Sequence, residues 1–127
     1  MANIKNVVIV REDLNLPFGL LAAQVAHIAM EPLRQSLLKE EKSYEDFNSW
    51  VKSPYLYIHK VPNKEWLDYY INKAQYAKLP VSCWHDTLYL KSSPTQQIAF
   101  ENVLVGASLG PSDSDKIKSV IGDLPLL

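Results

Sequence analysis

The side chains of this chain that could do chemistry begin with a polar stripe near the N-terminus. Leu20, Gln24, His27 and Glu31 follow one another at helical spacing, so on a helix they share one side. A helix that follows a strand begins near the carboxyl edge of the sheet, where α/β proteins bind ligands. Its free N–H groups also suit an anion or a developing oxyanion. The alternative is a solvated face of ordinary polar residues, with the alanine-rich face packed against the sheet.

A second candidate is the pair His85-Asp86, which follows an apolar run. If that run is a strand parallel to the first strand, Asp86 lies at the same edge of the sheet as Gln24. An aspartate there can orient a water molecule, accept a proton or pair with a cation. Equally, Asp86 could cap the turn after the strand, as aspartate often does.

The other reactive or aromatic side chains fit a structural role. Trp84, His59 and the tyrosines could stack on nucleobases, but aromatic residues within strands and helices usually belong to the core, and we predict this for them. Cys83 stands within an apolar run, which predicts a buried and inert thiol.

The pattern of apolar residues predicts the elements that position these side chains. Short runs rich in β-branched residues predict strands, and apolar residues at a period of about 3.6 predict helices. Strands are expected at Val7–Val10, Tyr55–Val61, Val81–His85 and Asn102–Ala107, and helices from Gly19, at Tyr44–Lys52, after the Pro62-Asn63 cap, and between Ser112–Asp115 and Gly122. The order β-α-α-β-α-β-β-α predicts an α/β fold with a four-stranded mixed sheet flanked by helices.

Local features make this prediction more specific. Pro32 is expected to kink or split the first helix, and Ser43 to cap the second. No helical period is visible from Thr87 to Phe100, where we expect a long loop. The helix faces expected to pack are Ala22, Val25 or Ala26, Ala29, Leu33 and Leu37 in the first helix, Leu67, Tyr70 or Ile71, Ala74 and Ala77 in the third, and Ile117, Val120 and Ile121 in the last.

Length and composition indicate a single globular domain, residues 1–127. Charged residues make up 21% and hydrophobic residues 47% of the chain, the balance of a folded protein. The net charge of −1 shows no basic surplus of the kind that nucleic-acid binding usually produces. One cysteine, no signal-peptide core and no apolar run that could span a bilayer predict a cytoplasmic protein without membrane contact.

Missing motifs disfavour several classes of enzyme. The four glycines form neither a dinucleotide fingerprint nor a P-loop. His27, His59 and His85 have no metal-ligand spacing to one another or to Cys83, and no nucleophile-elbow motif is present. Dehydrogenases, kinases and zinc hydrolases are therefore disfavoured, and we expect neither a cofactor nor a metal.

Three segments in one order span nearly the whole chain. They are Val7–Leu14 with Gly19–His27, then Lys60-Val61-Pro62 with Leu79-Pro80 and the strand ending at Asp86, and last Leu109-Gly110-Pro111 with Ile121–Leu127. The most specific part is the run Ala22-Ala23-Gln24-Val25-Ala26-His27. Together these segments resemble the type 2 peptidyl-tRNA hydrolase family.

The resemblance implies a fold, a reaction and a site. The family has an α/β fold around a four-stranded mixed sheet and cleaves the ester between a peptide and its tRNA. Its active-site glutamine and aspartate correspond to Gln24 and Asp86 here, whereas its lysine position holds Leu20. Its Asp-Ala-Gly-x-Thr run is replaced by Asp86-Thr87-Leu88-Tyr89-Leu90. With His27 from the same helix, the candidate catalytic residues are Gln24, Asp86 and His27.

Two functions from different classes follow. The first is a diverged peptidyl-tRNA hydrolase that uses Gln24, Asp86 and His27 on peptidyl-tRNA or a related acyl substrate, with tRNA or peptidyl-tRNA as its partner. The second is a catalytically silent binding module on the same fold, which recognises a small ligand or a protein partner. Either is compatible with a homodimer.

Overall fold

The computed structural model describes residues 3–39, 44–93 and 95–127, which fold into strands and helices in the predicted order. The elements are β1 (Ile4–Arg11), α1 (Phe18–Lys39), α2 (Tyr44–Lys52), β2 (Tyr55–Val61), α3 (Lys64–Tyr76), β3 (Val81–Ser93), β4 (Gln96–Asp113) and α4 (Ser114–Ile121). This order confirms the predicted α/β architecture. No helix in the described part of the chain is long and apolar enough to cross a membrane.

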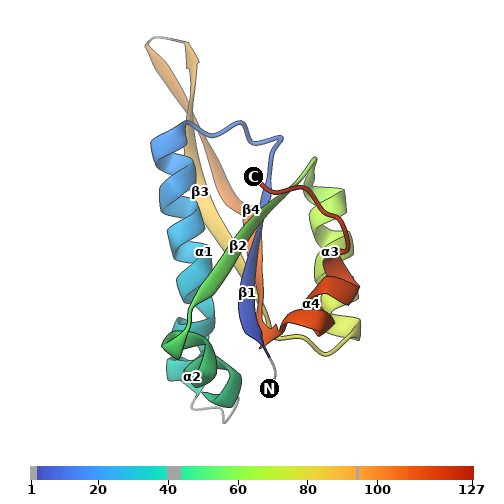
Figure 1. The fold of residues 1–127 in the computed structure, drawn as a ribbon. Coiled ribbons are helices and arrows are strands. Elements are labelled where there is room, and N and C mark those ends of the chain that lie inside the picture. Colours follow the sequence, from blue (N-terminus) through green and yellow to red (C-terminus); the bar gives the residue numbers. More distant parts are fainter. Residues whose placement is uncertain (1–2, 40–43, 94) are drawn as a thin grey trace.

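The four strands form one mixed sheet in the order β2-β1-β4-β3. β1 pairs in parallel with β2, while β4 is antiparallel to both β1 and β3. β3 therefore runs in the same direction as β1, so the carboxyl ends of these two strands point the same way. Helix α1 covers one face of the sheet, and α3 and α4 cover the other (Figure 1).

Alternate residues of β1 feed two hydrophobic cores, one on each face of the sheet. Val7 and Ile9 pack with residues of α3 and α4, whereas Val8 and Val10 pack with α1. All four are at most 1% exposed. A strand buried on both faces reads as an unbroken apolar run, which is why the sequence identifies it so clearly.

Gly106 of β4 allows the layers to approach at the centre of the sheet. It pairs with Val10 on one side and Trp84 on the other. A Cβ at this position would fall against the carbonyl oxygen of Ile9 and the side chain of Ile28. Only glycine therefore fits between β1 and α1 here.

The expected loop from Thr87 to Phe100 is wrong, because most of it forms a hairpin. β3 and β4 continue their antiparallel pairing with Leu88 opposite Phe100 and Tyr89 opposite Ala99. The two long strands extend beyond the body of the sheet (Figure 1). Tyr89 and Phe100 are exposed, so burial imposes little alternation of apolar and polar residues on this arm. The backbone N–H and C=O groups of the arm are satisfied by strand pairing.

The packed face of α1 also differs from the prediction. Ala22 and Ala26 are exposed, and Leu37 is 63% exposed, whereas Val25 and Ile28 are buried. Of the expected face, Val25 is thus confirmed, and it packs with Ile28, Val8 and Val10 in one core. The helix also continues through Pro32 without being split.

The later helices follow their predicted patterns. Leu67, Ile71 and Ala74 of α3 are buried, as are Ile117, Val120 and Ile121 of α4. The Asn63 side chain accepts a bond from the Trp66 N–H at 3.0 Å, which confirms the expected cap of α3. In α4 the capping position is Asp113, whose side chain makes no capping bond, and the expected Gly122 ends the helix. The predicted cap Ser43 lies outside the described residues.

Candidate active site

The structure brings Gln24 and Asp86 into direct contact. The Gln24 side-chain Nε2 donates a hydrogen bond of 2.9 Å to Oδ2 of Asp86. Val10 of β1 pairs with Gly106 of β4, and Gly106 pairs with Trp84 of β3 on its other side. Asp86, two residues after Trp84, therefore lies just past the level where β1 ends its pairing with β4. The expected meeting of the two side chains at the carboxyl edge is therefore present, because β3 is parallel to β1.

Trp84 fixes the orientation of the Gln24 amide. Its indole Nε1 donates to Oε1 of Gln24 at 2.7 Å, so the amide oxygen faces Trp84 and the amide nitrogen faces Asp86. Gln24 is only 2% exposed, and both ends of its amide are satisfied by these bonds. Rotation of the amide by half a turn would oppose its oxygen to the carboxylate, which the indole donor prevents.

Asp86 receives a second hydrogen bond from its own chain. The Thr87 backbone N–H donates to Oδ1 at 2.8 Å. Each carboxylate oxygen thus accepts one bond, and the remaining lone pairs can orient a water molecule or take up a proton. The turn-capping alternative for Asp86 is wrong, because β3 continues to Ser93 and Asp86 pairs with Val103 within the strand.

His27 contacts the pair only through Trp84. The imidazole lies parallel to the indole, with ring centroids 4.9 Å apart and an interplanar angle of 4°. His27 and Trp84 also border a hollow of about 480 Å³ that continues along α1 past Met30 and Leu33. The core role expected for Trp84 is therefore incomplete, since its indole N–H and its face both contribute to the site.

Glu31 and Leu20 do not join the Gln24–Asp86 pair. The buried Glu31 carboxylate accepts bonds from Arg34 and Gln35 on its own helix, at 3.2 and 3.1 Å. Leu20 is half-buried in the first turn of α1. The expected polar stripe thus divides into a site residue, a stacked histidine and a structural glutamate.

The start of α1, one turn before Gln24, offers free backbone donors. The Leu21 N–H is bonded to the Pro17 carbonyl oxygen at 2.9 Å, so the N–H groups at positions 18–20 precede the helical hydrogen-bond ladder. Such groups can stabilise a developing negative charge. A Cβ added at Gly19 would meet no heavy atom within 4 Å, so a ligand can approach this turn closely.

Cys83 is half-buried rather than fully buried. Burial, with a smaller contribution from the charge of Asp68, raises the pKa of its thiol. A raised pKa lowers the fraction of the nucleophilic thiolate. The expectation of a fully buried thiol is therefore wrong, and its inertness stays a prediction that the raised pKa favours.

Trp84 is the site residue that sequence reasoning missed. It precedes Asp86 by two positions on a strand, and residues at that spacing point to the same face. This two-residue spacing is the signal in the sequence that could have placed Trp84 beside Asp86. Among residues 3–39, 44–93 and 95–127, no group of three or more histidine, cysteine, aspartate or glutamate side chains could hold a metal ion.

Comparison with known proteins identifies the family. The model of the family described as "Peptidyl-tRNA hydrolase PTH2" matches residues 4–127. A peptidyl-tRNA hydrolase of Staphylothermus marinus is 30% identical over 123 residues, which cover 97% of this chain and 94% of the relative. The peptidyl-tRNA hydrolase of Metallosphaera sedula is 32% identical over 132 residues, covering 98% and 100%. The chain therefore belongs to the PTH2 family of peptidyl-tRNA hydrolases.

Proposed function

We propose that this chain is a peptidyl-tRNA hydrolase, which cleaves the ester between a peptide and tRNA. The family match over residues 4–127 and the relatives of that name support this function. The observation in the structure that carries the proposal is the 2.9 Å bond between Gln24, in the second turn of α1, and Asp86. The comparisons do not favour the alternative of a catalytically silent binding module.

In this proposal Asp86 acts as the general base. A water molecule held by the carboxylate attacks the ester carbonyl carbon and gives its proton to Asp86. The bond from that carbon to the ribose oxygen then breaks, and the proton passes to the leaving oxygen, giving a free peptide acid and tRNA. General base catalysis of this kind contributes about 10²–10⁴-fold to a rate.

Gln24 and Trp84 hold the base, and the first turn of α1 faces the developing oxyanion. Gln24 fixes one carboxylate oxygen through its amide, and Trp84 fixes the amide. We assign His27 a supporting role, because its contact with the pair is through the Trp84 ring. Leu20 cannot supply the charge of the family lysine, so oxyanion stabilisation falls to backbone N–H groups. Losing one such electrostatic contact typically lowers a rate by about 10²–10³, and we expect slow turnover.

The direct test follows cleavage of a peptidyl-tRNA analogue by wild-type protein and by Asp86→Asn. Asparagine keeps the shape of the side chain but cannot accept the proton, so we expect kcat to fall by at least about 10²-fold. Asp115→Asn, an exposed acid on α4, is the matched control and should leave kcat unchanged. Turnover no faster than without enzyme, together with no tRNA binding at low salt, would refute the proposal.

Partners, assembly and location are inferred with the function. We propose tRNA or peptidyl-tRNA as the partner, residues 1–127 as one family domain, and the cytoplasm, where translation releases such substrates, as the location. A homodimer is proposed through the exposed apolar side chains of α1, among them Met30, Leu37 and Leu38. Sedimentation equilibrium should show a dimer for the wild type and a monomer for Leu37→Glu. A wild-type monomer at about 100 μM, a concentration that populates dimers with micromolar Kd, would contradict the dimer.

A further inference from the structure

A hollow on the α3 side of the sheet lies across the sheet from Gln24 of α1. It measures about 620 Å³ and is lined by the ends of β1 and β2, the first turns of α3 and the C-terminal segment. Val61, Pro62, Leu124 and Pro125 give it apolar walls. A concave, mostly apolar space of this size with a few polar groups is typical of a small-ligand site. The catalytic proposal makes no use of it.

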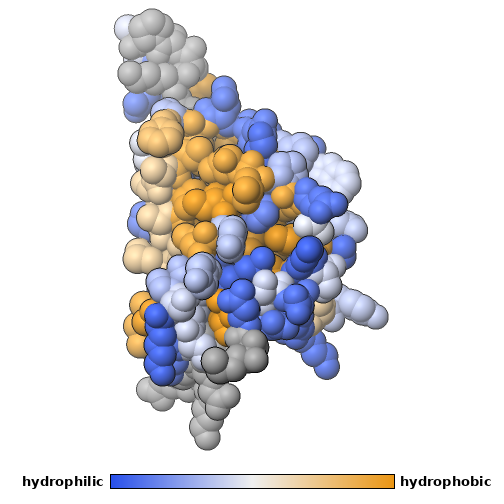
Figure 2. All heavy atoms as spheres, in the orientation of Figure 1, coloured by the Kyte–Doolittle hydropathy of each residue, from blue (hydrophilic) through white to orange (hydrophobic). Residues whose placement is uncertain are grey.

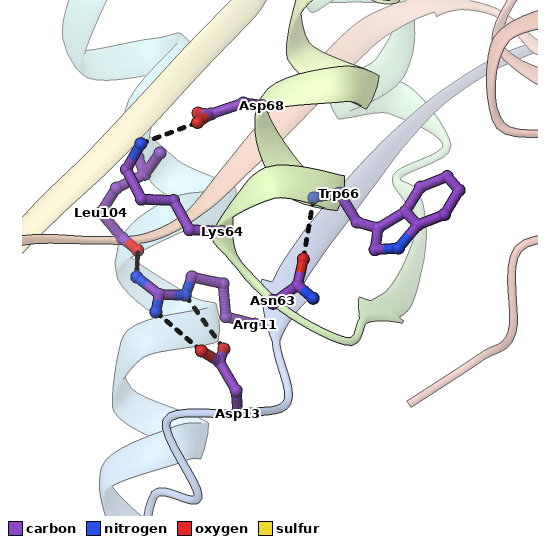
Figure 3. A network of polar contacts seen from close by, with 7 residues as sticks. All are labelled: Arg11, Asp13, Asn63, Lys64, Trp66, Asp68 and Leu104. Carbon is purple, nitrogen blue, oxygen red and sulfur yellow. Dashed lines mark hydrogen bonds and ion pairs between the residues drawn. The ribbon is translucent and has the colours of Figure 1, made fainter.

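Two aromatic side chains of α3 form one wall. Trp66 and Tyr70 lie one turn apart, with ring centroids 6.4 Å apart and an interplanar angle of 32°. Trp66 is 48% exposed, and it borders a second hollow of about 340 Å³ with Glu65 and Tyr69. Figure 3 shows the indole projecting from the start of α3, away from Arg11 and Asp13. A flat ring with open space beside it suits stacking with another flat ring.

The polar groups around the hollow favour an uncharged ligand. Asp13 is bound by Arg11 through two hydrogen bonds of 3.0 and 2.8 Å, and Glu12 pairs with Lys60 at 3.0 Å (Figure 3 shows the first pair). Because each acid already has a basic partner, the hollow attracts neither a cation nor an anion strongly. Glu12, Lys60 and Asn15 nevertheless provide both donors and acceptors of hydrogen bonds. A nucleobase has two flat faces and an edge with both kinds of group.

A neighbouring hollow adjoins the first and reaches the strand that includes Asp86. Asp13 lines both hollows, and the neighbouring one, of about 470 Å³, includes Leu88 and Phe100. Leu88 lies two residues beyond Asp86 on the same strand. A single-stranded nucleic acid whose terminal ester is at Asp86 could therefore follow this edge toward Trp66.

We propose that this hollow binds a nucleobase from the single-stranded 3′ end of the substrate tRNA, stacked on Trp66. Unpaired RNA bases are commonly held by stacking on aromatic side chains. This inference rests on the proposed function for the identity of the RNA, whereas the preference for a nucleobase rests on the hollow itself. The same chemistry could be supplied by a free nucleotide, and the experiment separates the two sources.

The test titrates 15N-labelled protein with the trinucleotide CCA and, separately, with AMP, and follows the indole N–H signal of Trp66 by NMR. We expect saturable shifts of this signal with CCA and much weaker binding of AMP. Trp66→Ala should weaken CCA binding and raise the KM for peptidyl-tRNA by about tenfold or more, with kcat nearly unchanged. Trp66→Phe keeps a stacking ring and should retain most of the affinity. Tyr76→Ala, a 92% exposed tyrosine at the end of the same helix, is the control that should change nothing.

Three results would overturn the inference: no CCA-dependent shift at Trp66, an unchanged KM for Trp66→Ala, or AMP binding as tightly as CCA. The last result would assign the hollow to free nucleotides. Its failure is distinguishable from failure of the proposed function. Hydrolysis that depends on Asp86 but not on Trp66 leaves the function standing, whereas CCA binding at Trp66 without hydrolysis leaves only the base site.

Discussion

The hydrogen bond from Trp84 to Gln24 provides the sharpest test of how the site is held. Trp84→Phe removes the indole N–H but keeps an aromatic ring beside His27. The Gln24 oxygen, which accepts that bond at 2.7 Å, is then left without its donor in a side chain that is 2% exposed. A buried polar atom without a partner costs about 1–3 kcal/mol. For a chain of this length, where 1 kcal/mol shifts Tm by about 3–5 °C, that corresponds to a fall in Tm of about 3–15 °C.

The same substitution should lower activity, because the amide can then turn. In the turned state the Gln24 oxygen would face the Asp86 carboxylate, and the base would lose the bond that holds it. Loss of about 1.4 kcal/mol of orientational preference lowers the ratio of the correct to the turned amide about tenfold. We expect kcat to fall with the remaining population of the correct state, by about twofold where the two orientations become equally populated. Urea unfolding and peptidyl-tRNA cleavage measure the two effects separately.

A double-mutant cycle and a matched tryptophan decide whether the effect passes through Gln24. In a Gln24→Leu background, Trp84→Phe should have little further effect on kcat, because the amide it orients is absent. Trp50→Phe removes an indole bond of the same 2.7 Å length, but to the exposed carbonyl oxygen of Tyr55, and should leave kcat unchanged. Equal and additive losses from Trp84→Phe in both backgrounds would refute the reasoning.

The remaining predictions concern the missing amine, the packing of the sheet and the thiol. Leu20→Lys should raise turnover by about 10-fold or more, measured by the same cleavage assay, by restoring a charge for the oxyanion. Gly106→Ala should destabilise by about 3 kcal/mol or more in urea unfolding, because its Cβ meets Ile9 and Ile28, whereas Gly19→Ala, with open space around it, should not. Because burial raises the pKa of Cys83, its proton is released more readily from the unfolded chain, so stability should fall as the pH rises above the ordinary thiol pKa. Cys83→Ser should lack that fall when the urea midpoints are compared between about pH 7 and 10.

The sequence predicted the fold wherever burial imposes a pattern. β1 is buried on both faces and reads as an apolar run, and α3 and α4 each bury one stripe against a single sheet face. The β3–β4 arm lacked such a signal. Large apolar residues such as Tyr89 and Ile98 are exposed there, so no core requires apolar and polar residues to alternate along the strands. Its pairing is decided by backbone hydrogen bonds, which leave little trace in side-chain types.

The packed face of α1 could not be chosen from periodicity alone. Alanines and larger apolar residues occur around the whole helix, so more than one face satisfies a helical period. Tertiary packing decides between them: Val25 and Ile28 pack against the sheet, and Ala22 and Ala26 are left outside. The inner side then includes Gln24, whose amide is buried only because Trp84 and Asp86 satisfy it.

The contact between Gln24 and Asp86 was predictable from the sequence, but the hydrogen bond from Trp84 that holds Gln24 was not. Gln24 and Asp86 could be placed at one edge once β3 was taken as parallel to β1. The bond from Trp84 depends on the distance between α1 and β3, which is set by Gly106 and the neighbouring core. No local pattern encodes that distance.

The Gln24, Trp84 and Asp86 side chains are bonded to one another and not to Leu20. The geometry of the proposed base is therefore independent of which residue stands at position 20, since none of the hydrogen bonds to Asp86 involves that residue. Leu20 is half-buried in the first turn of α1, where the carbon stem of a lysine can cover the same apolar surface while its amine reaches solvent. Leu20→Lys should consequently fold as well as the wild type. A gain in turnover without a change in stability would then show that the scaffold is intact and that position 20 limits turnover.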